Sequence, residues 1–458
     1  MLKYTSFTWL ITYVIALLCL ACNNNNGAND DTIKEKKDTI GNPAKDTGAG
    51  MVNVSVTTED TSVLIINTDT TAFRLVPHHI VLRKGVELDL NIPAGYNISV
   101  AAEGLRRLRF LCKSPDNRLF ATDLFDKSDN KKGRVYIFSG WDSTLRQYKK
   151  IHTFLDNLHN PNQVAFYTSN DSSYIYVAET GRLVYYFYHA GDTAAVGQPT
   201  VVASFPDYGL SYKYGGWHLT RSISFHQNKL YVSIGSSCNA CLETEDVRAT
   251  VLEMNPDGSG QKIFAAGLRN SVGLKWVNNQ LWATSMGRDL IGPDKPEDLL
   301  LRIQPGTRYH WPYYYQYQQR VYPDVQLQDS AVLHQVNIPP PPPVAYAGFK
   351  AHTAPLGFDY FSQFNDVALQ HAFLVALHGS TSVWRQRGNA IVKVNAGNKY
   401  TTVVDGFLTG KTEIERKGRP CDVLMNDNNS FFFTDDHNGV LYYVWKEDQQ
   451  APIHRVED

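Results

Sequence analysis

Two short motifs carry side chains that could do chemistry. His218 stands directly before a β-type run that starts at Arg221, and an imidazole there could act as a general base because it titrates near neutral pH. Arg269 and Asn270 hold the equivalent place before the next β-type run, where a guanidinium could bind a carboxylate or a quinone oxygen. A lone His is more often a hydrogen-bonded surface residue, and an Arg can simply bridge two sheets. Neither motif establishes a site by itself.

A third motif could bind a metal ion. Residues 286–289 (MGRD) open a loop that also contains Asp294, Glu297 and Asp298. Backbone and carboxylate oxygens are the ligands of hard cations such as calcium. An acidic loop of this kind is usually just solvated, so the metal site depends on its context.

Two of the cysteines stand close together in the sequence. Cys238 and Cys241 have the spacing of a redox or metal half-site, but no second pair follows, and Leu242 stands where a c-type haem needs His. A local disulfide between Cys238 and Cys241 is therefore expected rather than catalysis. The pairing of Cys112 and Cys421 is left open.

One repeating pattern predicts the scaffold that positions these residues. Each copy has an Arg, Pro or polar start, an apolar strand, a turn rich in Asn, Asp or Gly, and a second apolar strand. A solenoid would repeat at a shorter and more even period. Six copies predict an all-β fold, a six-bladed β-propeller with four-stranded antiparallel blades around a central channel. The copies are RFLCKSPDNRLFATD (109–123), PNQVAF with SSYIYVAET (161–180), RSISFHQNKLYVSIG (221–235), RNSVGLKWVNNQLWATSMG (269–287), PLGFDY with AFLVALHG (355–379) and RPCDVLMNDNNSFFFTDD (419–436).

Charge and length narrow the class of protein. The 458 residues carry a formal net charge of -1, from 44 basic and 45 acidic side chains, so no nucleic-acid partner is expected. A repeat-built β fold of this length can be one domain. The propeller is expected over 91–447, with a leading β segment of uncertain role at 51–90 and a tail at 448–458.

The N-terminus predicts export. Lys3 precedes an apolar stretch of 15 residues from Phe7 to Ala21, shorter than the roughly 20 residues of a membrane-spanning helix. Residues 1–22 are expected to be a lipoprotein-type signal peptide with lipidation at Cys22, although an ordinary signal peptide cut elsewhere is the alternative. Residues 23–50 lack apolar content and predict a disordered tether. The protein should then be lipid-anchored to a bacterial membrane, on its periplasmic side or at the cell surface.

Taken together, the motifs resemble a known family. WHLTRSISFHQNKLYVSIGSSCNAC (217–241), ATVLEMNPDGSGQKIFAAGLRN (249–270), LWATSMGRDLIGPDKPEDLLLRI (281–303) and YHWPYYY (309–315) look like the glucose/sorbosone dehydrogenases, six-bladed propellers that depend on pyrroloquinoline quinone (PQQ), and most of all their sorbosone-like branch. The resemblance extends to IPAGYNISVAAEGL (92–105), AHTAPLGFDY (351–360) and GRPCDV (418–423), and so covers roughly residues 90 to 447.

The resemblance implies roles for individual residues. His218 matches the general base that takes the sugar hydroxyl proton, and Arg269 and Asn270 match the pair that contacts PQQ. Gly287 and Arg288 match positions whose backbone carbonyls bind Ca²⁺. The expected reaction is hydride transfer from an aldose or a sorbosone-like sugar to calcium-bound PQQ, which yields a lactone or an acid. The residues matched to cofactor contacts elsewhere are Arg419, Thr353 and, in place of an expected Lys, His378.

Some positions depart from the family pattern. The glucose-oxidising branch has Asp where this chain has Trp217 and Ser236, so the partner that orients His218 is open. Cys421 stands where a second Arg is expected near Arg419. Two cationic cofactor contacts are thus changed, which allows a protein that binds no quinone.

The alternatives are a non-catalytic surface propeller that binds a glycan or protein partner, and a calcium-dependent lactone hydrolase. A sugar dehydrogenase of this kind also needs a separate electron acceptor, a cytochrome or a membrane quinone, because the chain contains no CxxCH motif.

Overall fold

A computed structural model describes residues 64–207, 218–380, 386–395, 399–410 and 414–446. The expected signal peptide 1–22 with Cys22, the tether 23–50, the tail 448–458 and Trp217 lie outside these residues. No helix within the described ranges is long and apolar enough to cross a membrane.

Six four-stranded antiparallel sheets confirm the predicted six-bladed propeller. Each of the six sequence repeats forms the first two strands of one blade, and the first strands of successive blades pack side by side in a closed ring. Blades 1 to 3 consist of β4 (Leu108–Lys113), β5 (Leu119–Asp123), β6 (Gly133–Asp142) and β7 (Gln147–Leu158); β8 (Gln163–Ser169), β9 (Ser172–Ala178), β10 (Arg182–Tyr188) and β11 (Thr200–Ser204); and β12 (Arg221–His226), β13 (Lys229–Ile234), β14 (Thr250–Met254) and β15 (Lys262–Ala266). Blades 4 to 6 consist of β16 (Leu274–Val277), β17 (Gln280–Ser285), β18 (Asp298–Ile303) and β21 (Ala347–Phe349); β22 (Pro355–Tyr360), β23 (Phe373–Leu377), β24 (Ala390–Asn395) and β25 (Lys399–Val404); and β28 (Pro420–Asp427), β29 (Ser430–Asp435), β30 (Val440–Lys446) and β3 (Tyr96–Ala102).

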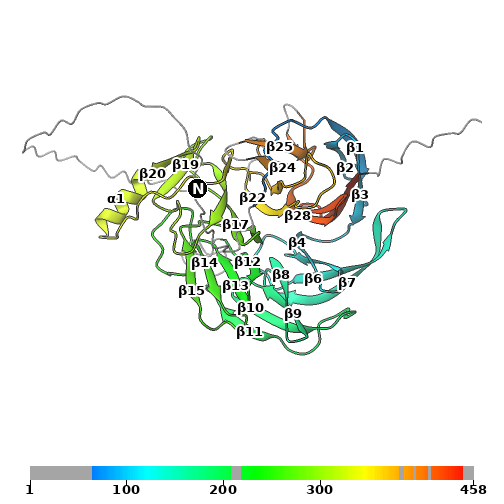
Figure 1. The fold of residues 1–458 in the computed structure, drawn as a ribbon, viewed down its shortest axis with the longest axis horizontal. Helices are drawn as coiled ribbons and strands as arrows, with labels where there is room; N and C mark the ends of the chain where they lie inside the picture. The colour runs from blue at the N-terminus through cyan, green and yellow to red at the C-terminus, as the bar shows by residue number, and fades with distance from the viewer. Residues whose placement is uncertain (1–63, 208–217, 381–385, 396–398, 411–413, 447–458) are drawn as a thin grey trace, which may run out of the picture. The chain divides into compact units, whose positions relative to one another are not determined.

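The ring is closed by strands from the two ends of the propeller. β3 pairs antiparallel with β30 and so completes the sixth blade, and Figure 1 shows this blue strand beside the red C-terminal one. Blade 6 therefore cannot form without residues more than 300 positions earlier in the chain. The repeats alone did not predict this pairing, because β3 lies before the first repeat.

Turn chemistry explains why the inner strands pair as hairpins. In blades 2, 3 and 4 the first two strands are joined by Asn170-Asp171, Gln227-Asn228 and Asn278-Asn279, and all six residues have positive φ. Two successive residues with positive φ make the turn whose twist matches a β-hairpin, and Asn and Asp tolerate this conformation best.

Neighbouring blades are joined by apolar packing and by buried hydroxyl groups. β23 and β29 are buried at every position, since adjacent blades cover both faces of each sheet. Thr284 of blade 4 donates a hydrogen bond to the carbonyl of Leu356 in blade 5 at 2.9 Å, and Thr434 of blade 6 donates to the carbonyl of Arg109 in blade 1 at 2.7 Å. Each such buried bond contributes roughly 1 kcal/mol.

The remaining elements lie outside the blades. β1 (Leu75–Val81) and β2 (Glu87–Pro93) form a hairpin within and just beyond the expected leading segment. β19 (Tyr314–Tyr317), β20 (Arg320–Pro323) and α1 (Val325–Leu333), whose N-cap is Asp324, are inserted between β18 and β21. β26 (Leu408–Thr409) and β27 (Glu415–Arg416) form a short ribbon before blade 6.

A buried carboxyl between blades 6 and 1 makes stability depend on pH. Asp422 accepts a hydrogen bond from the backbone nitrogen of Leu111 at 2.9 Å, and burial raises its pKa from 3.8 to about 7. Because the folded state holds this proton more tightly, the stabilisation is full below about pH 4 and is lost as the pH rises through about 7. The amide of Asp422→Asn stays neutral at all pH values. We therefore expect the free energy of unfolding of this variant, relative to that of the wild type, to be higher at about pH 8 than at about pH 5.

Urea unfolding at the two pH values measures this difference. The exposed Asp427→Asn, at the end of the same strand, is the control and should show no such gain. An Asp422→Asn difference that is the same at both pH values would contradict the assignment.

Candidate active site

Most of the predicted site residues line one cavity of about 610 Å³. Its lining comes from two kinds of connection, those that lead into the first strand of a blade and those that join the second and third strands. These connections lie at the same end of every blade, which is why segments distant in sequence meet there. His218, Arg269, Asn270, Gly287, His378 and Arg419 are all in the lining. Thr353 lies next to the cavity, is 1% exposed, and has its hydroxyl 3.2 Å from Asp298 Oδ2.

The hydrogen bonds of His218 define its tautomer. Its Nδ1 lies 2.9 Å from the carbonyl oxygen of Ser236 and 3.1 Å from the Ser236 hydroxyl. That hydroxyl donates its own hydrogen to the carbonyl of Cys238 at 2.7 Å. Both groups are therefore acceptors toward His218, so Nδ1 carries the hydrogen and Nε2 carries the lone pair. Ser236 thus orients the imidazole, which the sequence left open.

The surroundings of His218 keep it neutral and fixed. Burial and the nearby Arg269 guanidinium lower the pKa of His218 well below 6.5. Its backbone has a φ of 52°, a conformation that costs a non-glycine residue energy, and the Arg221 guanidinium supports it by donating to the His218 carbonyl at 2.7 Å. A neutral imidazole is the form that can accept a proton.

Gly235 gives His218 and Asn270 the room to approach each other. A Cβ at position 235 would lie 2.5 Å from the Cβ of His218 and 2.9 Å from Oδ1 of Asn270. We expect Gly235→Ala to displace both side chains and to lower kcat/KM at least about tenfold, because displacement of a catalytic group by about 1 Å can cost far more than this. Steady-state kinetics on the folded variant test this. Gly292→Ala controls for a general effect of replacing glycine, because its φ is not positive and the added Cβ meets only the Lys295 side chain, at 3.4 Å. Equal losses in both variants would refute the steric reason.

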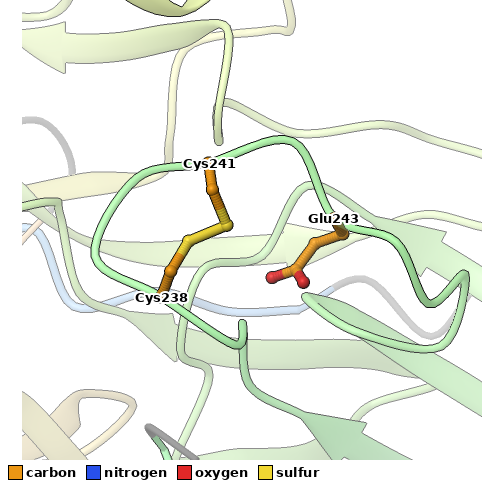
Figure 2. Close-up of side chains that lie close together, drawn as sticks. All are labelled: Cys238, Cys241 and Glu243. Carbon is orange, nitrogen blue, oxygen red and sulfur yellow. A yellow bond between two sulfur atoms is a disulfide. The ribbon is translucent and has the colours of Figure 1, made fainter. Parts of the chain in front are cut away.

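Arg269 is held by a loop that a disulfide closes. Cys238 and Cys241 are joined by a disulfide, and Figure 2 shows the Glu243 carboxylate beside it. We call residues 238–241 the disulfide loop. Its Asn239 accepts two hydrogen bonds from Arg269, at the backbone carbonyl and at Oδ1, each 2.9 Å long. Burial lowers the pKa of Arg269 to about 10, so the side chain remains a cation at neutral pH.

Asn239 also binds the segment that follows Gly287. Its Oδ1 accepts from the backbone nitrogen of Asp289 at 2.8 Å and its Nδ2 donates to the Asp289 carbonyl at 3.2 Å. The indole of Trp311 donates to the Asn239 carbonyl at 3.2 Å. Sequence reasoning assigned no role to Asn239, since only the CxxC spacing drew notice to this loop.

The three acids of the 286–298 loop are not gathered in space, so the carboxylate cluster that the sequence suggested is wrong. Asp294 pairs with Arg387, and Glu297 binds Gln316 and Gln318. Asp298 accepts from the backbone nitrogens of Gly287 and Ala354, both at 2.8 Å. The three acids thus bind partners in different elements, and of the three only Asp298 lines the cavity. Among the described residues, the one close group of three His, Cys, Asp or Glu side chains is Cys238, Cys241 and Glu243.

Gly287 and Arg288 differ in which of their atoms can reach the cavity. A Cβ at Gly287 would lie 2.6 Å from the ring of Pro296, so Pro296 packs against the backbone where a side chain would otherwise stand. The Arg288 guanidinium pairs with Asp324 at 2.6 Å and lines a smaller, separate cavity. Only the backbone of Arg288 is thus a candidate to act toward the main cavity.

The opposite side of the cavity is built around a buried carboxylate. Asp436 binds Arg107, Arg109 and His378 at 2.9, 2.8 and 2.7 Å. Burial opposes its ionisation, but these three partners lower the pKa of Asp436 well below 3.8. Burial, together with Arg419, lowers the pKa of His378 to about 3, so His378 is a neutral donor to Asp436 and does not supply the charge of the Lys that the resemblance led us to expect.

Arg419 and Cys421 have different environments. The Arg419 guanidinium donates to the backbone carbonyls of His378 and Gly379 at 3.0 and 2.6 Å. Cys421 is fully buried and packs in an apolar cluster with Phe110, Val272 and Leu356, which come from blades 1, 4 and 5 or their connections. Cys421 therefore contributes to the core and not to the cavity.

Solved structures share this fold. The PQQ domain of a pyranose dehydrogenase from Coprinopsis cinerea, in its holo form, has a TM-score of 0.63 at 14% identity and covers 80% of this chain and 98% of its own. A calcium structure of a Trichoderma reesei carbohydrate-active enzyme of family AA12 has a TM-score of 0.60 at 17% identity, with coverages of 83% and 100%. The soluble aldose sugar dehydrogenase of Escherichia coli, in its apo form, has a TM-score of 0.53 at 14% identity, with coverages of 77% and 100%.

At these identities the structural likeness shows the fold and no more, and it does not single out a sorbosone-like branch. No family model matches the chain. An uncharacterized protein of Borreliella burgdorferi is 29% identical over 231 residues, which are 48% of this chain and 58% of that protein. The chain thus matches little more than half the length of this relative. The chemistry has to be argued from the cavity itself.

Proposed function

We propose that this protein oxidises an aldose or a sorbosone-like sugar to its lactone or acid, with PQQ and Ca²⁺ as cofactors and His218 as the general base. The observation that carries the proposal is that His218, Arg269 and Arg419, from three different blades, face one cavity in a fold shared with sugar dehydrogenases. A binding propeller would not need a part-buried neutral imidazole whose tautomer is set by two acceptors.

The donors in the cavity fit the proposed cofactors. PQQ carries three carboxylates, and the cavity offers Arg107, Lys127, Arg269 and Arg419 as cations. Gly287 lines the cavity without a side chain, so its backbone faces the cavity, and backbone carbonyl oxygens are ligands that calcium accepts. Gly287 and Arg288 would hold the ion through these carbonyls, and Asn270, which lines the cavity, could contact the quinone. Thr353 is buried and bound to Asp298, so it would support the cavity wall from behind.

The residues of this chain would mainly accept a proton and orient the bound cofactor. When bound, the quinone and its calcium supply the hydride acceptor. His218 Nε2 would accept the proton of the sugar hydroxyl as the hydride leaves the same carbon, and the Ser236 carbonyl and hydroxyl would stabilise the imidazolium through Nδ1. Arg269, fixed by Asn239, would keep the cofactor in one orientation.

The cellular setting is part of the proposal. Export and lipid anchoring at Cys22 would place the enzyme on the periplasmic side of a bacterial membrane or at the cell surface. Electrons would then pass to a separate cytochrome or to a membrane quinone. The lactone hydrolase alternative needs acidic ligands that converge from several blades, and the described residues contain no such group of carboxylates.

Dye reduction by the reconstituted protein tests the function. The chain without residues 1–22 would be incubated with PQQ and calcium and assayed against a panel of aldoses and sorbosone. Reduction that requires sugar, PQQ and calcium supports the proposal. Tight PQQ binding without turnover of any sugar would favour a different substrate class, and the absence of both binding and turnover would favour a non-catalytic propeller.

A further inference from the structure

The side of the cavity formed by blades 6 and 1 carries more positive than negative charge. Arg107, Lys127 and Arg419 line it. The carboxylate within reach is Asp436, which is already shared among Arg107, Arg109 and His378. We call Arg107, Lys127 and Arg419 the cationic pole.

Two members of the cationic pole have no carboxylate partner among the described residues. The guanidinium of Arg419 is bound by backbone carbonyls of residues 378 and 379. Lys127 takes part in none of the ion pairs formed by the described part of the chain. Its side chain is accessible at the connection between β5 and β6, and burial together with Arg419 and Arg107 lowers its pKa to about 8. Lys127 is thus still mostly protonated at neutral pH.

Cations held this close to one another repel unless an anion joins them. The cavity is positively charged on this side and negatively charged on the other, because Asp289 and Asp298 lie next to Gly287 on the opposite side. A ligand with carboxylates at one end and neutral oxygens at the other would therefore enter in one orientation. A polycarboxylate ligand would be bound well by these cations.

The same side of the cavity lacks two cations that the resemblance led us to expect. His378 is neutral and bound to Asp436, and Cys421 is buried in the core. Lys127 and Arg107 reach the cavity from the first blade and its leading connection, and not from blades 5 and 6. The positive charge that blades 5 and 6 lack is therefore supplied by blade 1, which follows blade 6 in the ring.

We infer that Lys127, together with Arg107, binds a carboxylate of the ligand in this cavity and supplies the positive charge that His378 and Cys421 do not provide. The inference rests on the proposed function in taking PQQ as that ligand. It also makes a narrower claim that stands without the quinone, namely that the pole selects polycarboxylates.

Calorimetric titration of the calcium-loaded chain tests the inference with two probes, PQQ and pyridine-2,4,6-tricarboxylate. Loss of one charge-assisted hydrogen bond should raise the Kd of Lys127→Gln for both probes by about 10- to 100-fold. Lys127→Arg keeps the charge and should remain within about threefold of the wild type. Lys131→Gln, an exposed position in the same loop, is the matched control and should not differ from the wild type.

The outcomes separate the two claims. Equal PQQ affinity in the wild type and in Lys127→Gln overturns the role of Lys127 and leaves the proposed function intact. Tricarboxylate binding that depends on Lys127, without PQQ binding, supports the cationic pole and overturns the proposed function. If the wild type binds neither probe, both are overturned.

Discussion

Replacement of His218 by Ala should lower kcat by about 100- to 10,000-fold, the range that a positioned general base contributes. The physical reason is that His218 Nε2 carries the lone pair that can take a hydroxyl proton, since Nδ1 donates to Ser236. PQQ affinity should change much less, because other residues bind the anion. The measurement is steady-state dye reduction together with calorimetric determination of the PQQ Kd.

His226→Ala provides the control for this experiment. His226 lies at the far end of β12, where its ring stacks on Trp276 with centroids 4.0 Å apart. We expect its kcat to stay within about twofold of the wild type, as is usual for positions away from the chemistry. A His218→Ala enzyme that keeps more than about one tenth of the wild-type kcat would contradict the assignment of the base.

The second large effect is expected at the disulfide loop. Asn239→Ala removes the Oδ1 acceptor of Arg269 and of the Asp289 backbone and the donor to the Asp289 carbonyl. Loss of these bonds should loosen both Arg269 and the segment that follows Gly287, and we expect kcat/KM to fall by about 10- to 100-fold. Asn239 is a positioning residue, so the PQQ Kd should rise as well.

Asn239→Asp separates positioning from general damage. The aspartate keeps the oxygen that Arg269 and the Asp289 nitrogen use, and it should recover most of the PQQ affinity that Asn239→Ala loses. Mild reduction of the Cys238–Cys241 disulfide should act in the same direction as Asn239→Ala, and Cys112→Ser provides the thiol control. If Asn239→Ala changes neither Kd nor kcat/KM, the loop does not position Arg269.

The blade cores and the main motif positions could be predicted because their signals are local. Two apolar strands around an Asn-rich turn indicate a hairpin wherever they occur, and six such units imply the ring. A residue directly before an inner strand must then lie at one end of the blades, which brought His218, Arg269 and Arg419 together in the prediction.

Interactions set by the ring closure and by single backbone atoms could not be predicted. Ser236 orients His218 largely through its carbonyl, which leaves no mark on residue type. Lys127 lies in a charged stretch that is typical of a solvated loop, and only the approach of blades 1 and 6 places it beside Arg419. The acids at 294, 297 and 298 show the opposite error. Nearness in sequence did not bring their side chains together, because each is held by a different partner: Asp294 by Arg387, Glu297 by Gln316, and Asp298 by the backbone of Gly287.

The most direct test of the account is the absorption spectrum of PQQ bound to the calcium-loaded chain when one equivalent of sugar is added without oxygen or dye. The account predicts that a sugar reduces the bound quinone in the wild type and that His218→Ala binds the quinone but leaves it oxidised. Bound quinone that no sugar reduces, or that His218→Ala reduces at the wild-type rate, would contradict it.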